Sequence, residues 1–237
     1  AASDVYKRQP YYWCIYLYIF AFIFTAAAWG CYALDPGLGK AWRKSAILIL
    51  LFAFAIHTFT LFARMYLMDR PMVFVTNLYS TAVFIGWAAV GVGLIVERVV
   101  PITLGCTVAA VLGFLSCLLA HQLATSGDTL EMMRAVLDTN FWLATHVTTI
   151  NLGYSATYMA GLIGIGYLVL GIGTPHLKRV VEINGQKQEL GRLIGQILYG
   201  AIAGATVLSF VGTVLGGIWG DQSWGRFWGW DPKAVSY

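Results

Sequence analysis

Six long apolar stretches, separated by short polar segments, constrain this chain more than any other feature of its sequence. A helix needs about 20 apolar residues to cross a hydrocarbon core of about 30 Å. The stretches cover residues 11–34, 45–65, 78–96, 99–119, 147–172 and 196–219. Lipid offers no partner to open backbone groups, so these stretches must be helices, and a membrane barrel would instead show alternating segments of about ten residues. We therefore expect an all-α, polytopic membrane helix bundle.

The low charge content agrees with this class. Only 11% of the 237 residues are charged and 59% are hydrophobic, whereas a soluble domain carries about 25% charged residues. The formal net charge of +4 comes from scattered Lys and Arg, so nucleic acid is not an expected partner. The four cysteines lie within apolar stretches and form no CxxC pair, so they indicate neither a zinc site nor a thiol-redox centre.

We expect one domain in three parts. Residues 11–219 would form the transmembrane bundle, and residues 1–10 would be a non-native or disordered leader because they are polar, unlike the apolar stretch after them. Residues 220–237 would form a truncated, Trp-rich loop. Two GxxxG spacings, Gly200 with Gly204 and Gly212 with Gly216, are expected to pack helices closely.

The positive charges predict an orientation for the bundle. The segments after the first, third and fifth stretches carry eight cations, Lys40, Arg43, Lys44, Arg98, Lys178, Arg179, Lys187 and Arg192. The opposite side has three, Arg64, Arg70 and Arg134, or seven when Lys7, Arg8, Arg226 and Lys233 are counted. The positive-inside rule therefore places the first set in the cytoplasm and the Trp-rich loop on the outer face.

The Trp-rich loop is the most unusual local feature. The chain reads GGIWGDQSWGRFWGWDPK after the sixth stretch and holds four of its nine tryptophans there. An aromatic belt explains Trp at an interface, but not the interleaved glycines and the Asp-Pro-Lys end. Indole faces stack on a flat π-system, glycines allow close approach, and cations pair with ligand carboxylates, a combination that suits haem. The candidate pocket residues are Trp219, Trp224, Arg226, Trp228, Trp230, Asp231 and Lys233.

Three segments also resemble a known family. WGRFWGWDPK is similar to the signature of the WWD haem-handling family of cytochrome c biogenesis. The stretch from His57 to Trp87 resembles the His, Arg, Pro and Asn-Leu-Tyr pattern of its System II branch, the CcsA/ResC type. WLATHV, from Trp142 to Val147, resembles the outward-facing histidine that precedes the Trp-rich loop. Six helices precede the loop here, against about three in the smaller System I relative (CcmC), so the System II branch fits better.

The resemblance implies a haem path. Family members are thought to carry b-type haem, held non-covalently in transit, to an outer site and to present it to the CxxCH segment of apocytochrome c. A CcsB/ResB-like membrane subunit is the expected partner, and the expected location is the bacterial inner membrane or the equivalent thylakoid membrane. If the chain is part of an enzyme, that enzyme would be the cytochrome c haem-lyase or synthase, but the sequence assigns no general acid or base.

The histidines carry different expectations. His146 is expected to be an axial ligand of haem iron at the outer site, with an interfacial histidine as the alternative. His57 lies within the second stretch and either holds haem in transit or bonds to another helix, for example to Asn151 or Tyr79. Arg64, seven residues further on, shares a face with His57 and either pairs with a haem propionate or snorkels to the surface.

Some features depart from the family pattern. The family has further helices and a second outer histidine after the Trp-rich loop, so one axial ligand is expected to be missing from a chain that stops at Tyr237. Ala234 and Ser80 stand where relatives commonly have Glu. Other classes stay open: a permease without synthase activity, a System I haem-delivery relative (CcmC/CcmF type), and an electron-transfer subunit. The electron-transfer subunit is disfavoured because only His57 lies well inside an apolar stretch.

Overall fold

The computed structural model describes residues 2–126, 129, 139–183 and 185–227. Its helices are α1 (Ala2–Leu34), α2 (Pro36–Leu67), α3 (Leu78–Val99), α4 (Leu104–Ser126), α5 (Asn140–Trp142), the π-helical segment η2 (Leu143–Val147), α6 (Thr148–Gly173) and α7 (Leu190–Trp224). Between α6 and α7 lie a 3₁₀ turn, η3 (Pro175–Lys178), and the strands β1 (Val180–Ile183) and β2 (Gln186–Glu189). Six helical spans in the part described are long and apolar enough to cross a membrane, which confirms the predicted all-α polytopic bundle.

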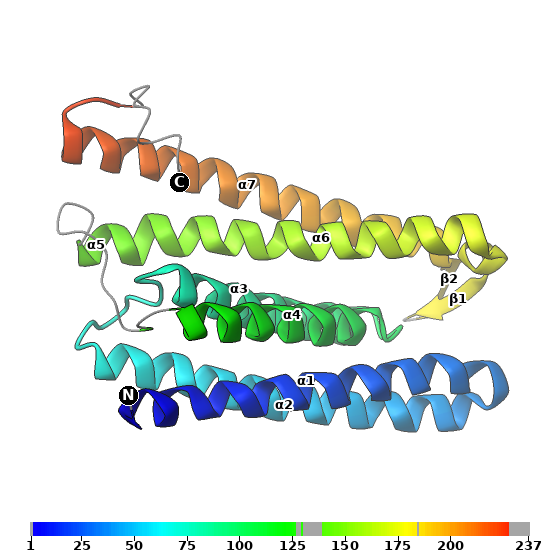
Figure 1. Ribbon diagram of the computed structural model, residues 1–237. Coiled ribbons are helices and arrows are strands. Elements are labelled where there is room, and N and C mark those ends of the chain that lie inside the picture. The colour runs from blue at the N-terminus through cyan, green and yellow to red at the C-terminus, as the bar shows by residue number, and fades with distance from the viewer. Residues whose placement is uncertain (1, 127–128, 130–138, 184, 228–237) are drawn as a thin grey trace.

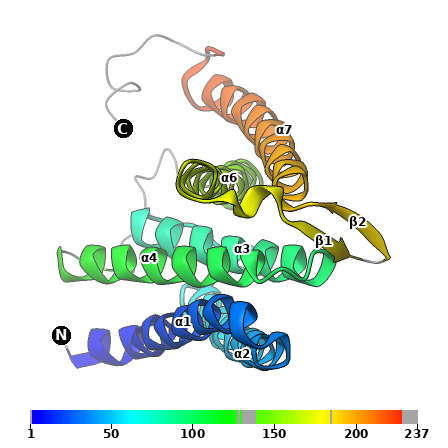
Figure 2. The same cartoon turned by 90° about the vertical axis from the view of Figure 1, so that its right-hand side faces the viewer.

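The helices form antiparallel pairs stacked in layers (Figure 1). Helix α1 packs against α2 and also against α4, whereas α3 packs against both α4 and α6. Helix α7 packs along α6, and Figure 2 shows it at the edge of the stack. The segment η2, which directly precedes α6, also contacts α7.

Each long helix crosses the molecule once, so the connections collect at two ends. The turn between α1 and α2, the turn between α3 and α4, and the β1–β2 hairpin lie at the right of Figure 1, which we call the hairpin end. The α2–α3 connection, helix α5 and the C-terminal end of α7 lie at the opposite end, the tryptophan end. The connections that follow the first, third and fifth spans therefore lie at one end of the bundle, as the distribution of positive charges predicted. The assignment of the hairpin end to the cytoplasm stays a prediction.

Several helix ends differ from the predicted spans. Helix α1 begins at Ala2, within the segment 1–10 that we expected to be a non-native or disordered leader, and that expectation stays a prediction. The fifth span begins at Asn140 instead of residue 147, and α7 continues to Trp224. Hydropathy predicts only the part of a helix that lies within lipid. The helix itself can continue beyond that part until a capping residue ends it. Here the cap is Gly225, whose left-handed backbone (φ 69°) ends α7.

The β1–β2 hairpin was not predicted. Its strands pair antiparallel, with Val180 opposite Glu189 and Ile183 opposite Gln186. The sequence carries Asn-Gly at positions 184–185, and Gly185 adopts a φ of 79°. Asn-Gly between alternating residues is a strong hairpin signal, because the turn needs residues that accept positive φ.

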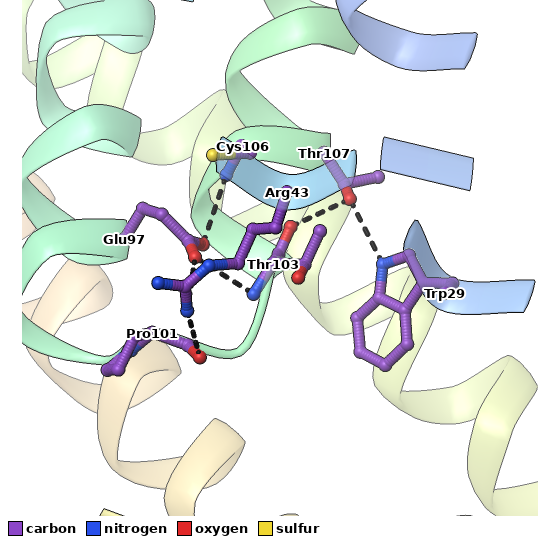
Figure 3. Close-up of polar contacts among 7 residues, drawn as sticks. All are labelled: Trp29, Arg43, Glu97, Pro101, Thr103, Cys106 and Thr107. Carbon is purple, nitrogen blue, oxygen red and sulfur yellow. Dashed lines mark hydrogen bonds and ion pairs between the residues drawn. The ribbon is translucent and has the colours of Figure 1, made fainter. Parts of the chain in front are cut away.

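A buried polar cluster joins three helices at the hairpin end (Figure 3). The Glu97 carboxylate on α3 accepts the backbone N–H groups of Thr103 (3.0 Å) and Cys106 (3.4 Å) at the start of α4. Arg43 on α2 lies 3.5 Å from the same carboxylate and donates to the carbonyl of Pro101 at 2.5 Å. The Glu97 side chain therefore caps the first turn of α4 and links it to α2.

Candidate functional site

A cluster of two tryptophans and one histidine lies at the tryptophan end, where α5 and η2 meet α7. The rings of Trp142 and Trp219 are nearly parallel, with centroids 6.4 Å apart and an interplanar angle of 16°. The imidazole of His146 lies 5.6 Å from the Trp219 ring at an angle of 57°. Both indoles are buried, and Val73 and Leu143 pack with them. We call Trp142, His146 and Trp219 the aromatic–histidine cluster.

The sequence predicts that His146 lies at the start of a span, and the structure shows which groups of α7 contact its imidazole. His146 lies in the π-helical segment η2, is half-buried, and places its Nδ1 2.7 Å from the carbonyl oxygen of Gly212 on α7. A Cβ at Gly216 would lie 2.7 Å from the His146 Cε1 atom. The imidazole therefore rests on bare backbone of α7.

The two GxxxG spacings behave differently. A Cβ at Gly212 would lie 2.9 Å from Ile150 of α6, so this glycine allows the close packing that we predicted. Gly216 of the same spacing faces the histidine instead of an apolar side chain. Around Gly200 and Gly204, an added Cβ would meet no described atom within 4 Å beyond its chain neighbours and its own helix backbone, so no other described helix packs closely against this spacing.

The two indole N–H groups of the cluster have different surroundings. The Trp142 Nε1 donates to the Gln222 side chain at 3.0 Å. The Trp219 Nε1 is buried and has no hydrogen-bond partner among the residues that the structure describes. Buried indole N–H groups usually find an acceptor. The Trp219 donor therefore suits a ligand with an acceptor atom, such as a carboxylate.

Of the other predicted loop residues, Trp224 and Arg226 are exposed, and the rest lie outside the described part. Trp224 ends α7 and is 58% exposed, and in the described residues it makes no ring contact. Arg226 is exposed, with its carbonyl 3.9 Å from a Cβ built at Gly220. Phe227, which we did not predict, lies against Gly217. Outside the described residues lie Trp228, Trp230, Asp231 and Lys233.

Arg64 has protein partners at the tryptophan end. Its guanidinium donates to the backbone carbonyl of Thr129 and lies 5.1 Å from the ring centroid of Tyr79. The Asn77 side chain donates to the same carbonyl at 2.9 Å. Arg64 of α2 and Asn77, the N-cap of α3, therefore share the Thr129 carbonyl as an acceptor. Pairing of Arg64 with a propionate stays a prediction.

His57 belongs to a different polar contact. It is fully buried, and its Nδ1 lies 2.9 Å from the hydroxyl of Tyr18 on α1. A bond to another helix was one of the two expectations, but the partner of Nδ1 is neither Asn151 nor Tyr79. Asn151 donates to the carbonyl of Val147 at 2.7 Å instead. The transit-ligand role of His57 stays a prediction.

Sequence reasoning missed four residues that build the cluster: Trp142, Gln222, Gly212 and Gly216. Trp142 was visible four residues before His146 in WLATHV, at a spacing that puts two side chains on one face of a helix. The glycines were visible only as a packing motif. Nothing in the local sequence around Gln222 indicates that it accepts from Trp142.

The fold defines an integral membrane protein of several spans, with the aromatic–histidine cluster at one end. The chain belongs to the Cytochrome C assembly protein family, whose profile matches residues 75–237. This confirms the predicted resemblance of the chain to cytochrome c biogenesis proteins of the CcsA type.

Individual relatives agree with the family. The chain is 26% identical over 190 residues to the cytochrome c biogenesis protein CcsA of Synechococcus sp. (strain CC9311), a match that covers 68% of this chain and 61% of the relative. It is also 26% identical over 186 residues to CcsA of Mesostigma viride, covering 68% and 58%. Protein NrfI of Wolinella succinogenes is 28% identical over 217 residues, covering 92% of this chain and 23% of that protein. The chain thus spans about three fifths of the length of the CcsA relatives.

Proposed function

We propose that the chain handles haem for cytochrome c biogenesis, and that the aromatic–histidine cluster is the place where haem is held and presented. The observation that carries the proposal is a half-buried histidine beside two stacked indoles, at the end of the bundle where the Trp-rich segment begins. Family membership supports the biological context, since the CcsA relatives are cytochrome c biogenesis proteins by name.

The residues present fit b-type haem held without a covalent bond. His146 offers a nitrogen ligand, and neutral imidazole is a common ligand of haem iron. The indole faces of Trp142 and Trp219 offer flat apolar surface, and the Trp219 Nε1 offers a buried donor to a carboxylate. Bound haem would supply the two vinyl groups to which cysteine thiols add. Trp224, Arg226, Trp228, Trp230, Asp231 and Lys233 would complete the site.

The contribution of the protein is mainly positioning. His146 would hold the iron, and the indoles would set the plane of the ring so that thiols of a docked peptide meet the vinyl groups in reactive geometry. The proposed partners are the CxxCH segment of apocytochrome c and a CcsB/ResB-like membrane subunit. The tryptophan end would face the outer side of the membrane, as the charge distribution predicts.

Haem retention by the purified chain tests the proposal. The chain is produced in a haem-replete host, extracted in mild detergent, and measured for its Soret band and its haem-to-protein ratio. We expect the wild-type chain to retain haem and His146→Ala to lose affinity by more than about tenfold, since even outer-shell partners of metal ligands matter by 10–100-fold. Added imidazole should restore the spectrum of His146→Ala by occupying the vacated position.

The matched control is His176→Ala, because His176 lies exposed in η3 at the hairpin end. It should leave the Soret band unchanged. Circular dichroism and gel filtration verify that both variants fold. A wild-type chain that retains no haem, or a His146→Ala spectrum identical to that of the wild type, would overturn the proposal.

A further inference from the structure

The hydrogen bond of His146 decides which of its ring nitrogens carries the proton. The Nδ1 atom lies 2.7 Å from the carbonyl oxygen of Gly212. A carbonyl oxygen only accepts hydrogen bonds, so Nδ1 must be the donor. A neutral imidazole has one protonated nitrogen, and the lone pair is therefore on Nε2. Among the described residues, Nε2 has no hydrogen-bond partner.

The backbone of α7 next to this carbonyl is shaped to receive the ring. A Cβ built at Gly216 would lie 2.7 Å from Cε1, 3.1 Å from Nδ1 and 3.3 Å from Nε2 of His146. The first distance is shorter than side chains tolerate, so any other residue at this position would displace the imidazole. Gly212 in turn lets α6 approach α7, since its own Cβ would meet Ile150 at 2.9 Å.

The helix segment that carries His146 also has an unusual backbone conformation. His146 lies in η2, a five-residue π-helical segment between α5 and α6. A π-helical turn arises from an inserted residue, and such segments occur frequently at functional sites. One inserted residue turns the preceding part of the helix by about 100° relative to the following part. The direction of His146 toward α7 thus depends on the π-helical segment as well as on the glycines.

We propose that the Gly212 carbonyl and the bare backbone at Gly216, together the α7 seat, are a positioning device for His146. The seat holds the imidazole as the Nδ1–H tautomer and reserves Nε2 for the iron. This inference rests on the proposed haem function and deepens it, because it assigns the coordinating nitrogen and the group that orients it. Metal-binding histidines commonly donate their second N–H to a carbonyl or carboxylate, which fixes the ring and raises its basicity.

The first test needs no haem. The chain is labelled with ¹⁵N-histidine, placed in lipid nanodiscs, and studied by solid-state NMR, which distinguishes the two neutral tautomers. The His146 signal is identified by its absence from His146→Ala. We expect the Nδ1–H tautomer in the wild-type chain and a changed signal in Gly216→Ala. The matched control, Gly204→Ala on the same helix, should leave the signal unchanged, because no described atom lies within 4 Å of its Cβ.

The second test is a haem titration of the same three proteins. Gly216→Ala should bind haem about 10–100-fold more weakly than the wild-type chain, and Gly204→Ala should match the wild type. Binding that depends on His146 but is equal in Gly216→Ala and wild type would overturn the seat and leave the proposed function standing. An Nε2–H tautomer in the wild-type chain would also overturn the seat, and this result does not require Gly216→Ala to fold. A chain that binds no haem would overturn the proposed function itself.

Discussion

The ion pair between Arg43 and Glu97 offers a sharp test of how the layers are joined at the hairpin end. The two side chains are 3.5 Å apart, with 24% of Arg43 and 2% of Glu97 exposed. At an effective dielectric constant of 20, unit charges at this distance attract by about 5 kcal/mol. Much of that attraction only offsets the cost of removing the carboxylate from water. The net contribution of the ion pair to the free energy of unfolding therefore depends on which groups remain unpaired after each substitution.

The two single substitutions leave different defects. Glu97→Gln keeps the shape but turns one acceptor oxygen into an amide donor that faces a backbone N–H group. Hydrogen bonds to charged groups contribute about 1.5–3 kcal/mol, so we expect the unfolding free energy to fall by about 2 kcal/mol. Arg43→Gln leaves a buried carboxylate without its cation, compensated by backbone N–H groups that include those of Thr103 and Cys106. Removal of one partner of a buried pair costs about 3–5 kcal/mol, and with these N–H groups in place we expect about 3 kcal/mol.

The double variant measures the interaction itself. Hydrogen-bonded pairs in a membrane protein couple by about 0.6 kcal/mol on average and about 1.7 kcal/mol at most. A buried charge pair belongs at the upper end of that range, so we expect a coupling free energy of about 1.5 kcal/mol. The sum of the two single losses should therefore exceed the loss in the double variant by that amount.

Two measurements check this cycle. Denaturant unfolding in detergent micelles gives the four free energies. Alkylation of Cys106, followed by mass spectrometry, reports local opening because this buried thiol lies in the first turn of α4, whose backbone bonds to Glu97. Cys117, equally buried further along α4, is the internal control. A coupling within about 0.3 kcal/mol of zero, with unchanged protection of Cys106, would refute the assignment of this pair as a link between layers.

Three further predictions address other contacts. Tyr18→Phe removes a hydroxyl 2.9 Å from a buried imidazole of α2, so denaturant titration should show a loss of about 1 kcal/mol while the Soret band stays unchanged. Gly105→Ala would drive a Cβ into the backbone carbonyl of Gly93 on α3, whereas at Gly161 no described atom lies within 4 Å. Thermal unfolding should show a loss of about 2 kcal/mol for the first and little change for Gly161→Ala, and equal stabilities would contradict this. Trp142→Phe loses the 3.0 Å bond to Gln222 but keeps a ring for stacking, so haem titration should show a smaller loss of affinity than for Trp142→Ala.

The existence of the helices could be predicted from the sequence with little error, because apolar length and the need to satisfy backbone groups leave few options in lipid. Their ends could not. Helix α7 continues through Trp219 to Trp224, since nothing before Gly225 ends it. The start of the fifth span was misplaced for the same reason, because polar or aromatic residues near an interface can still be helical. Hydropathy therefore placed His146 at the edge of a helix that in fact begins at Asn140.

The partners of the predicted site residues were harder to foresee than the residues themselves. A helical pattern shows which side chains share a face, but not which face of another helix lies opposite. His57 contacts Tyr18 because α1 packs against α2, and Arg64 donates to the carbonyl of Thr129, far from it in the sequence. The rotation of His146 also depends on a π-helical turn, and no residue type signals such a turn on its own.

The α7 seat shows why a packing motif in a membrane helix can also form part of a site. A carbonyl oxygen has two lone pairs, so one that accepts a bond within its own helix can still accept another from a neighbouring side chain. That second bond requires a close approach, which the missing Cβ atoms of Gly212 and Gly216 permit. Gly200 and Gly204 have the same spacing on the same helix, but no described residue lies against them. The GxxxG spacing therefore predicts only that the helix backbone is accessible to a neighbouring side chain. The residue that faces this backbone, here His146, determines which contact forms.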